Sequence, residues 1–446
     1  MFPIKRISKF MGAAMFAACA AQAAPVEVEV WLTLSPYNQN EFEKLAKQFN
    51  NEQNETKVVV KNFPNRAALR AAGQKAIAEN RRPNLIQIED DRSPELTALH
   101  KEIVPLYELL KQHPIADLNW FLPQTTGFMR NSKQQLLAFP FMAEIPLMFY
   151  NIDGYKKSGL DANKPPATWI ELQGNLIELR DKADYTCPYG TSQQVSIHLE
   201  NLAPINDVLF VTPNNGLEVT KQQPELNFDS VFMRHLSIMV SWKRSDLFTQ
   251  HTNGDEADEM FAKNKCAVVT TGSGALGQFL DTRGLKFGVA PLPYYQQVTE
   301  KPGAPFVGGS ALWATSGHTK EENKSTMSFL AYLSKPVVAA AWHQKTGFLP
   351  LTDAAYRTAD VAFYDKVPGA RNVIASMKNA NSKNSRSFRI KNYERVEAIM
   401  SREFDAAISG TTPPVQALNI AISESKPLMQ DPSVPAKQPA TSTKKK

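Results

Sequence analysis

An alternation of short apolar runs and helical periodicities near the start of the chain constrains the fold most strongly. Residues 26–32 read Val-Glu-Val-Glu-Val-Trp-Leu and residues 57–61 hold three consecutive valines, which predicts two strands. Helices are predicted between and after them at 40–49 and 66–79, followed by a buried strand at 85–88. A strand–helix–strand–helix–strand order predicts a parallel sheet with right-handed crossovers. We therefore expect an α/β fold.

The length of the chain predicts two lobes, because 446 residues are more than one hydrophobic core usually supports. Residues 136–151 are apolar, β-like and interrupted by two prolines, which is typical of a segment that leaves the first lobe. We expect discontinuous lobes of residues 24–140 plus 292–347 and 141–291 plus 348–430, each with a mostly parallel sheet flanked by helices. A hinge between such lobes lets a cleft close on a ligand.

The carboxyl ends of parallel strands position the first candidate residues. Ligands of open α/β sheets lie beyond these ends, which places Ser35, Arg66 and Asp90 near one rim. Asp90 belongs to Glu-Asp-Asp at 89–91, which we interpret as a polar strand end rather than a metal site, because adjacent side chains in a strand alternate faces.

Residues 342–350 read Trp-His-Gln-Lys-Thr-Gly-Phe-Leu-Pro and follow an alanine-rich helical run at 329–341. Gly347 stands where a helix would end, and Pro350 prevents it from restarting. An extended segment after a helix end is a suitable place for an aromatic side chain to face a cleft, which makes Phe348 a candidate.

The two ends of the chain carry signals of their own. Residues 1–23 combine a basic region, a short apolar core and an Ala-Gln-Ala cleavage site, which predicts a signal peptide and a periplasmic location. An imperfect lipobox leaves lipid anchoring at Cys19 as an alternative. Residues 431–446 are rich in Pro, Ser, Thr and Lys, which predicts a disordered tail.

The same ends explain the net charge of +6, since the signal contributes +3 and the four lysines after Asp431 contribute +4. The remaining body, at −1, gives no reason to expect nucleic acid as a partner. Cys187 and Cys266 can pair in an oxidising compartment, although their sequence does not show that they meet. The seven histidines lack metal-ligand spacing, and we expect no metal and no other cofactor.

Residues 272–277 match Gly-x-Gly-x-x-Gly after a predicted strand, and three interpretations remain open. A dinucleotide fingerprint would need an acidic residue about 20 positions later, and none is convincingly placed. Free N–H groups at Gly272 and Ser273 can instead bind an anion. A tight structural turn is the third interpretation. No nucleophile elbow or acid–base pair suggests catalysis.

Short sequence motifs between Val26 and Leu418 resemble those of bacterial sn-glycerol-3-phosphate-binding proteins. These are the periplasmic receptors of Ugp-type ABC importers in extracellular solute-binding protein family 1. The motifs include 342–350, Phe-Pro-Phe at 139–141, Tyr-Lys-Lys-Ser-Gly-Leu-Asp at 155–161 and Leu-Glu-Asn at 199–201. Both Cys187 and Cys266 fall where the family has cysteines. The resemblance implies a two-lobed periplasmic binding protein that is a monomer and has no reaction of its own. It also implies partners, namely ABC permease subunits in the inner membrane and a cytoplasmic ATPase.

The resemblance implies binding positions as well. Gly309 and Arg395 match the family, and the Arg395 guanidinium suits phosphate oxygens. The remaining pocket positions carry different residues from the family. Arg66 and Phe348 replace Tyr, Asp90 replaces Glu, Glu144 and Gly272 (next to Ser273) replace Ser, and Gln193 and Ser196 replace two Trp.

These replacements change the charge of the expected pocket. An acid at Glu144 repels phosphate unless a cation intervenes, and Arg66 or a cation on the ligand can supply it. We expect glycerol-3-phosphate or a zwitterionic glycerophosphodiester, such as glycerophosphocholine or glycerophosphoethanolamine. Arg395, Arg66 and Ser273 would hold the phosphate, and Glu144 or Asp90 would face the amine.

A sugar or polyol without phosphate is the rival ligand, because the absent Trp residues remove surface for cation–π contacts. Two other function classes contrast with a transport receptor. A dinucleotide-dependent enzyme would bind NAD, and a sensor or adhesin-like surface component would lack neighbouring permease genes.

Overall fold

The computed structural model describes most of the chain between the predicted signal peptide and the predicted tail. The described residues are 24–89, 92–116, 118, 128–131, 133–217, 222–251, 254–371, 377 and 383–430. Cys19, Asp90 and residues 431–446 therefore lie outside the described residues. No helix within the described ranges combines the length and the apolar character needed to cross a membrane.

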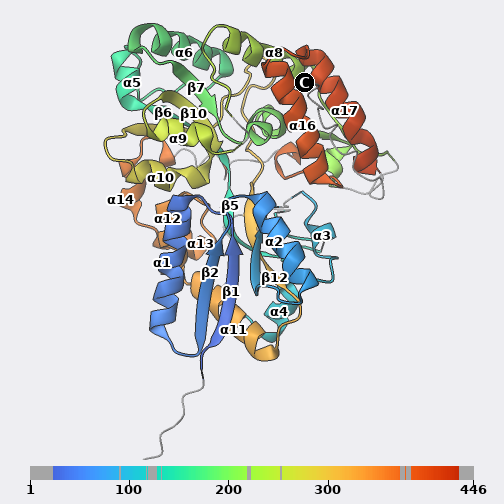
Figure 1. Cartoon of the computed structure of the whole chain (residues 1–446). Helices are drawn as coiled ribbons and strands as arrows, with labels where there is room; N and C mark the ends of the chain where they lie inside the picture. Colours follow the sequence, from blue (N-terminus) through green and yellow to red (C-terminus); the bar gives the residue numbers. More distant parts are fainter. Residues whose placement is uncertain are drawn as a thin grey trace, which may run out of the picture.

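The first lobe is built on a six-stranded sheet, in the lower half of Figure 1. Its strands are β1 (Val26–Leu32), β2 (Thr56–Asn62), β3 (Leu85–Ile88), β4 (Ile103–Val104), β5 (Phe139–Glu144) and β12 (Gly308–Thr315). The order is β2-β1-β3-β12-β4, with β5 also paired to β12. β1 runs parallel to β2 and β3, which confirms the predicted parallel core, whereas β12 is antiparallel to its three partners.

Helices cover this sheet on both faces (Figure 1). They are α1 (Pro36–Glu52), α2 (Arg66–Ala78), α3 (Pro94–Thr97), α4 (Leu106–Gln112), α11 (Lys320–Leu333), α12 (Pro336–Thr346) and α13 (Asp353–Thr358), and a short helix α14 (Val361–Lys366) follows α13. The predicted single helical run at 329–341 is wrong. Two helices occupy it, because Pro336 lacks the N–H that would continue α11 and instead begins α12. Gly347 ends α12 with φ 89°, as predicted.

The second lobe is built on a four-stranded sheet of order β11-β6-β10-β7. Its strands are β6 (Pro146–Asn151), β7 (Cys187–Thr191), β10 (Cys266–Gly272) and β11 (Phe287–Ala290), and a separate hairpin pairs β8 (Val211–Thr212) with β9 (Glu225–Leu226). Only β7 and β10 are parallel, because β6 runs antiparallel to both of its neighbours. A mostly parallel sheet was expected in each lobe, but the sheets of both lobes are mixed, since β12 is antiparallel in the first and β6 in the second.

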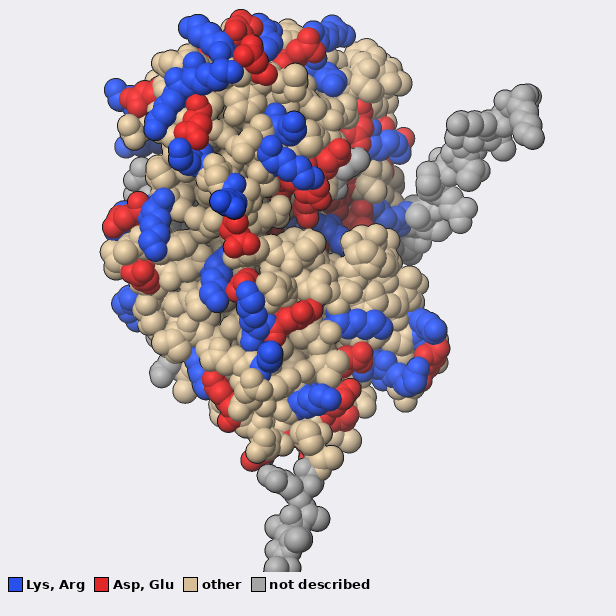
Figure 2. All heavy atoms as spheres, turned by 60° about the vertical axis from the view of Figure 1, so that its left-hand side comes forward, with Lys and Arg blue, Asp and Glu red and all other residues tan. Residues whose placement is uncertain are grey.

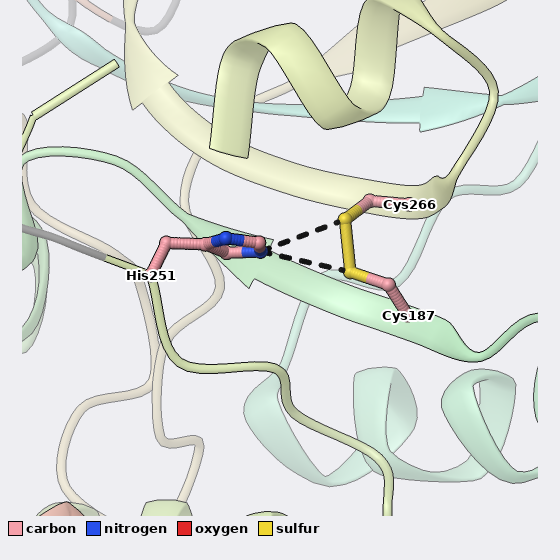
Figure 3. Close-up of side chains that lie close together, drawn as sticks. All are labelled: Cys187, His251 and Cys266. Atoms are coloured by element: carbon pink, nitrogen blue, oxygen red, sulfur yellow. Dashed lines mark hydrogen bonds between the residues drawn. A yellow bond between two sulfur atoms is a disulfide. The ribbon is translucent and has the colours of Figure 1, made fainter. Parts of the chain in front are cut away.

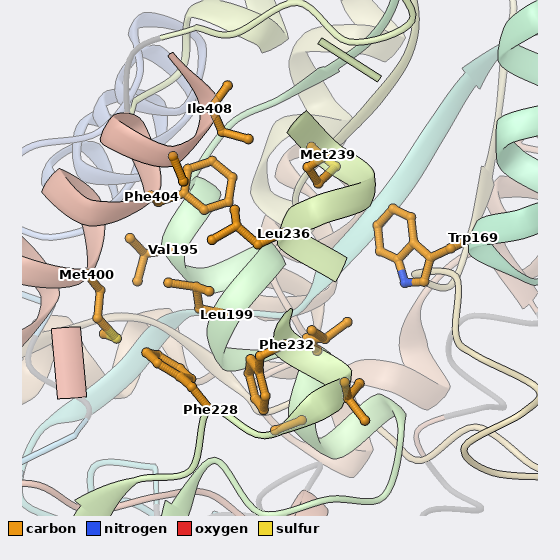
Figure 4. Packing of buried hydrophobic residues seen from close by; sticks show 14 of the residues in the cluster. Trp169, Val195, Leu199, Phe228, Phe232, Leu236, Met239, Met400, Phe404 and Ile408 are labelled. Atoms are coloured by element: carbon orange, nitrogen blue, oxygen red, sulfur yellow. The ribbon is translucent and has the colours of Figure 1, made fainter. Parts of the chain in front are cut away.

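The helices of this lobe include several that lie far apart in the sequence. They are α5 (Ile152–Lys157), α6 (Trp169–Ala183), the π-helix η1 (Ser196–Glu200), α7 (Leu202–Ile205), η2 (Asn214–Gly216), α8 (Ser230–Arg244), α9 (Glu256–Ala262), η3 (Ser273–Ala275), α10 (Leu276–Asp281), η4 (Lys383–Ser385), α16 (Tyr393–Ile408) and α17 (Pro414–Gln430). α8, α16 and η1 meet in one apolar cluster, shown in Figure 4. Its buried members include Leu199, Phe232, Leu236 and Phe404. Thr168 caps α6 through a capping box.

A single residue joins the two sheets at the first crossing. β5 ends at Glu144 in the first sheet and β6 begins at Pro146 in the second, so the chain passes between lobes at Ile145. Leu351 and Ala355 pack in the core of the first lobe, beyond its predicted end at 347. The residue bounds of the two lobes stay a prediction.

Cys187 and Cys266 form a disulfide between the parallel strands β7 and β10 (Figure 3). The His251 ring points at it, with Nε2 at 3.9 Å from the Cys187 sulfur and 3.8 Å from the Cys266 sulfur. All three side chains are buried. The sequence left open whether the two cysteines meet, and the disulfide shows that they do. The bond occupies both sulfur atoms.

Two histidines form a buried chain of hydrogen bonds across the second lobe. His198 Nδ1 lies 2.9 Å from His235 Nε2, and His235 Nδ1 lies 2.8 Å from the Tyr295 hydroxyl. Burial lowers the pKa of His235 to about 3, and burial with the neighbouring His235 lowers the pKa of His198. Both rings are therefore held neutral at physiological pH.

Replacing His235 by Gln should remove a pH-dependent destabilisation. The unfolded state takes up a proton near pH 6.5, whereas folded His235 does not until about pH 3, so its contribution to stability falls as the pH falls. The stability of the wild type relative to the variant should decrease by roughly 2 kcal/mol between pH 7 and pH 5. Urea unfolding at both pH values measures it, with His100→Gln as the exposed control. If the difference in unfolding free energy between the wild type and the variant is the same at both pH values, His235 is not held neutral in the folded protein.

Replacing both cysteines by serine should destabilise the second lobe by about 2–5 kcal/mol, because the disulfide restricts the unfolded chain. Its two ends are 79 residues apart in sequence. Urea unfolding of the double variant measures the loss. The wild type unfolded in the presence of a dithiol reductant is the control, and it should approach the variant. Equal stability of the oxidised wild type and the variant would speak against a structural role.

Candidate ligand-binding cleft

A cavity of ≈950 Å³ lies between the two lobes and is lined by residues from both. The first lobe contributes the turns that follow β1, β2 and β3, together with β5 and β12. Ser35 and Arg66 belong to these turns, so the carboxyl ends of the parallel strands meet the cavity as the sequence predicts. Ser35 and Asn65 cap α1 and α2 there, which fixes the two turns.

Three segments of the second lobe line the cavity with residues of which the sequence singled out only Gln193 and Ser196, through the family resemblance. η1 and the residues before it contribute Gln193, Ser196 and Glu200, and the start of α9 contributes Asp255 and Asp258. η1 is a π-helix, a rare element that often occurs at functional sites. One face of α16 contributes a stripe of polar side chains at helical spacing, comprising Glu394, Glu397, Ser401 and Asp405, with Ala398 among them. That spacing was the available signal in the sequence.

Acidic side chains outnumber basic ones among the described residues that line the cavity. The acids are Glu89, Glu144, Glu200, Asp255, Asp258, Glu394, Glu397 and Asp405, and the bases are Arg66, Arg92 and Arg402. Acidic side chains also gather at the waist between the lobes on the face shown in Figure 2. Elsewhere on that face, charges of both signs are interspersed (Figure 2).

Each of the three arginines has an acidic partner. Arg66 pairs with Glu89 of its own lobe and, at 3.7 Å, with Glu397 across the cleft. Arg402 pairs at 2.7 Å with Glu403 and at 2.8 Å with Glu424. The Arg66 side chain is 58% exposed, which leaves it accessible to a ligand. Arg70 and Glu394 form a further ion pair between the lobes.

Arg92 is a guanidinium of the first lobe that is buried against the second. It lies 3.4 Å from Glu200 and packs over the ring of Phe388, with 4.3 Å from the guanidinium carbon to the ring centroid. The Tyr393 hydroxyl donates to the other oxygen of Glu200 at 2.5 Å. Both Arg92 and Glu200 are almost fully buried, so the pair joins the lobes at a buried edge of the cavity.

The crowded acids of the cleft hold protons more tightly than isolated ones. Burial raises the pKa of Glu144 to about 7, opposed by the Gly274 N–H. Burial likewise raises the pKa of Glu397 to about 7, opposed by Arg66. Burial also raises the pKa of Glu89, Asp255 and Asp258, the last despite hydrogen bonds from Ser192 and Thr271. Near neutral pH the cleft can therefore adjust its charge to that of a ligand.

The glycine-rich stretch 272–277 forms a close-packed turn. A Cβ on Gly277 would meet the Lys345 carbonyl at 1.8 Å, and one on Gly274 would meet Phe348 at 2.7 Å. The Ser273 N–H donates to the Ile145 carbonyl at 2.7 Å, and the Gly274 N–H donates to Glu144 at 3.1 Å. The Ser273 N–H, which was expected to bind an anion, is thus already engaged by the protein, as is the neighbouring Gly274 N–H.

The structure brings most of the sequence-predicted site residues to one place. Those that line the cavity are Arg66, Glu144, Gly272, Gly309 and Phe348. Ser273 is buried beside Gly272 and is not among the lining residues, and neither is Arg395, although its helical neighbours Glu394 and Glu397 are. Asp90 lies outside the described residues. Phe348 stacks on Trp342 with ring centroids 5.6 Å apart.

Comparisons with known proteins fit this architecture. The family model for bacterial extracellular solute-binding proteins matches residues 44–369. The sn-glycerol-3-phosphate-binding periplasmic protein UgpB of Salmonella typhimurium is 31% identical over 425 residues, covering 94% of this chain and 96% of that protein. Its counterpart in Escherichia coli K12 is 31% identical over 411 residues, covering 91% and 93%.

Solved structures share the fold at low sequence identity. UgpB from Mycobacterium tuberculosis in complex with glycerophosphocholine has a TM-score of 0.69 at 16% identity, covering 90% of this chain and 98% of that one. A solute-binding protein from Thermotoga lettingae bound with α-D-tagatose has a TM-score of 0.73 at 18% identity, covering 91% and 100%. The long match to the family model and the 31% identity to full-length relatives together decide the classification: the chain belongs to the bacterial extracellular solute-binding proteins.

Proposed function

We propose that this protein is the periplasmic solute-binding component of an ABC importer, exported by its signal peptide and acting as a monomer. The observation that carries the proposal is the cavity lined by both lobes in a chain whose relatives are periplasmic binding proteins. The protein would capture its ligand by lobe closure and deliver it to permease subunits driven by a cytoplasmic ATPase. It would catalyse no reaction itself.

We infer that the ligand is glycerol-3-phosphate or, with better charge balance, a zwitterionic glycerophosphodiester. The ligand in the names of the relatives supports the phosphate part. Arg66 is an accessible cation for it, because the ligand can replace Glu397, which lies 3.7 Å away. The excess of acids in the cavity favours a ligand with a positive group, which glycerol-3-phosphate lacks.

A sugar or polyol without phosphate is the second candidate. It is favoured by the pairing of all three lining arginines with acids of the protein, since carboxylates are good acceptors for hydroxyl groups. The tagatose complex of the Thermotoga lettingae protein has the same fold.

Calorimetry on the mature protein distinguishes the candidates. Glycerol-3-phosphate, glycerophosphoethanolamine, glycerophosphocholine and a sugar panel would be titrated at pH 7.5. We expect heat with at least one phosphate ligand and none with the sugars. Binding of a sugar alone would transfer the assignment to the second candidate.

Arg66→Gln should weaken a phosphate ligand by about 10–100-fold, because a charge-assisted hydrogen bond contributes about 1.5–3 kcal/mol. Arg395→Gln is the matched comparison from α16. Since Arg395 is not among the described lining residues, we expect its replacement to change affinity less than threefold. If replacing Arg395 lowers the ligand affinity more than replacing Arg66 does, the phosphate binds at Arg395, as the family resemblance implies.

A further inference from the structure

Glu144 occupies a special position in the cleft, at the end of β5 and one residue before the chain crosses to the second lobe. One carboxylate oxygen accepts the Gly274 N–H at 3.1 Å, and the other accepts from the Gln193 side chain at 3.4 Å. Both donors belong to the second lobe. A carboxylate of the first sheet is therefore held by donors across the crossing, with part of its surface on the cavity.

Three glycines leave the space that this carboxylate fills. A Cβ on Gly272 would lie 2.2 Å from a Glu144 oxygen, and one on Gly274 would lie 2.9 Å from it. A Cβ on Gly309 would lie 3.1 Å from the Glu144 side chain, and its φ of 96° also favours glycine. The backbone on both sides of the cleft is thus shaped around an acid at position 144.

Within the part of the chain that the structure describes, no cation pairs with this acid. Among the described residues Glu144 makes no ion pair, and the charged groups that act on it most are the acids Glu89 and Asp255. It also uses the Gly274 N–H, which an anionic ligand would otherwise need. A phosphate at this end of the cavity would lose that donor and meet a carboxylate.

A carboxylate in this setting also distinguishes between kinds of cation. Its remaining lone pairs accept N–H donors, which a primary ammonium has and a quaternary ammonium lacks. A quaternary ammonium instead favours aromatic faces. Among the described lining residues, the aromatic ones are Phe348 and Tyr393, and Phe348 already stacks on Trp342.

We propose that Glu144 sets the ligand class of the cleft by excluding an anionic group from its end of the cavity and binding a primary ammonium there. The inference rests on the proposed function and narrows it. The favoured ligand is a glycerophosphodiester with a primary ammonium head, its phosphate on the Arg66 side. Glycerophosphoethanolamine is the simplest molecule with this chemistry.

The test is calorimetry at pH 7.5 with glycerophosphoethanolamine, glycerophosphocholine and glycerol-3-phosphate on three proteins. The wild type should bind glycerophosphoethanolamine at least tenfold more tightly than the other two ligands. Glu144→Gln keeps the side-chain shape and removes the charge. It should weaken glycerophosphoethanolamine at least tenfold and bring its affinity close to that of glycerol-3-phosphate. Glu55→Gln removes an exposed carboxylate away from the cavity and should match the wild type.

The outcomes separate the inference from the function on which it rests. Phosphate ligands that bind with the same ranking in wild type and Glu144→Gln would overturn the role of Glu144 and leave the receptor intact. A wild type that prefers glycerol-3-phosphate or glycerophosphocholine would overturn the inference by itself. The inference can therefore be refuted even if Glu144→Gln does not fold. Failure of every phosphate ligand to bind would overturn the inference together with the proposed ligand.

Discussion

The passage of the chain through Ile145 is the constraint on which the cleft depends. Glu144 belongs to the first sheet and Pro146 to the second, so one residue sets the distance between the sheets. The Ser273 N–H donates to the Ile145 carbonyl at 2.7 Å, which fastens the end of β10 to the same point. Side chains from both lobes therefore converge where the backbone has least freedom, and this convergence makes a defined binding site possible.

Much of the fold could be predicted from local patterns. The first strand at Val26–Leu32 and the buried strand at Leu85–Ile88 have the predicted bounds, because each has a clear pattern of apolar residues. The direction of β12 could not be predicted in this way. It enters the first sheet antiparallel, beside a strand more than 200 residues earlier, and no local pattern encodes such a pairing.

The candidate site was predictable only where a strand end, a helix end or the family resemblance pointed to it. Arg66 followed from the strand ends, Phe348 from the helix end before it, and Glu144 from the resemblance. Asp255, Asp258 and Glu200 were missed, because ordinary polar residues become a lining only when η1, α9 and α16 meet. The burial of Arg92 could not be predicted from the sequence either, since its partner Glu200 is 108 residues away along the chain.

The buried Arg92 has a consequence for how the lobes separate. Its guanidinium comes from the first lobe but lies over Phe388 and beside Glu200 in the second. Removing one partner from a buried ion pair costs about 3–5 kcal/mol, whereas Arg66 and Glu397 are already in contact with water. Opening should therefore begin at the Arg66 side while the Arg92 side stays closed. Entry and exit of solute would then be directional, through one mouth rather than along the full length of the cleft.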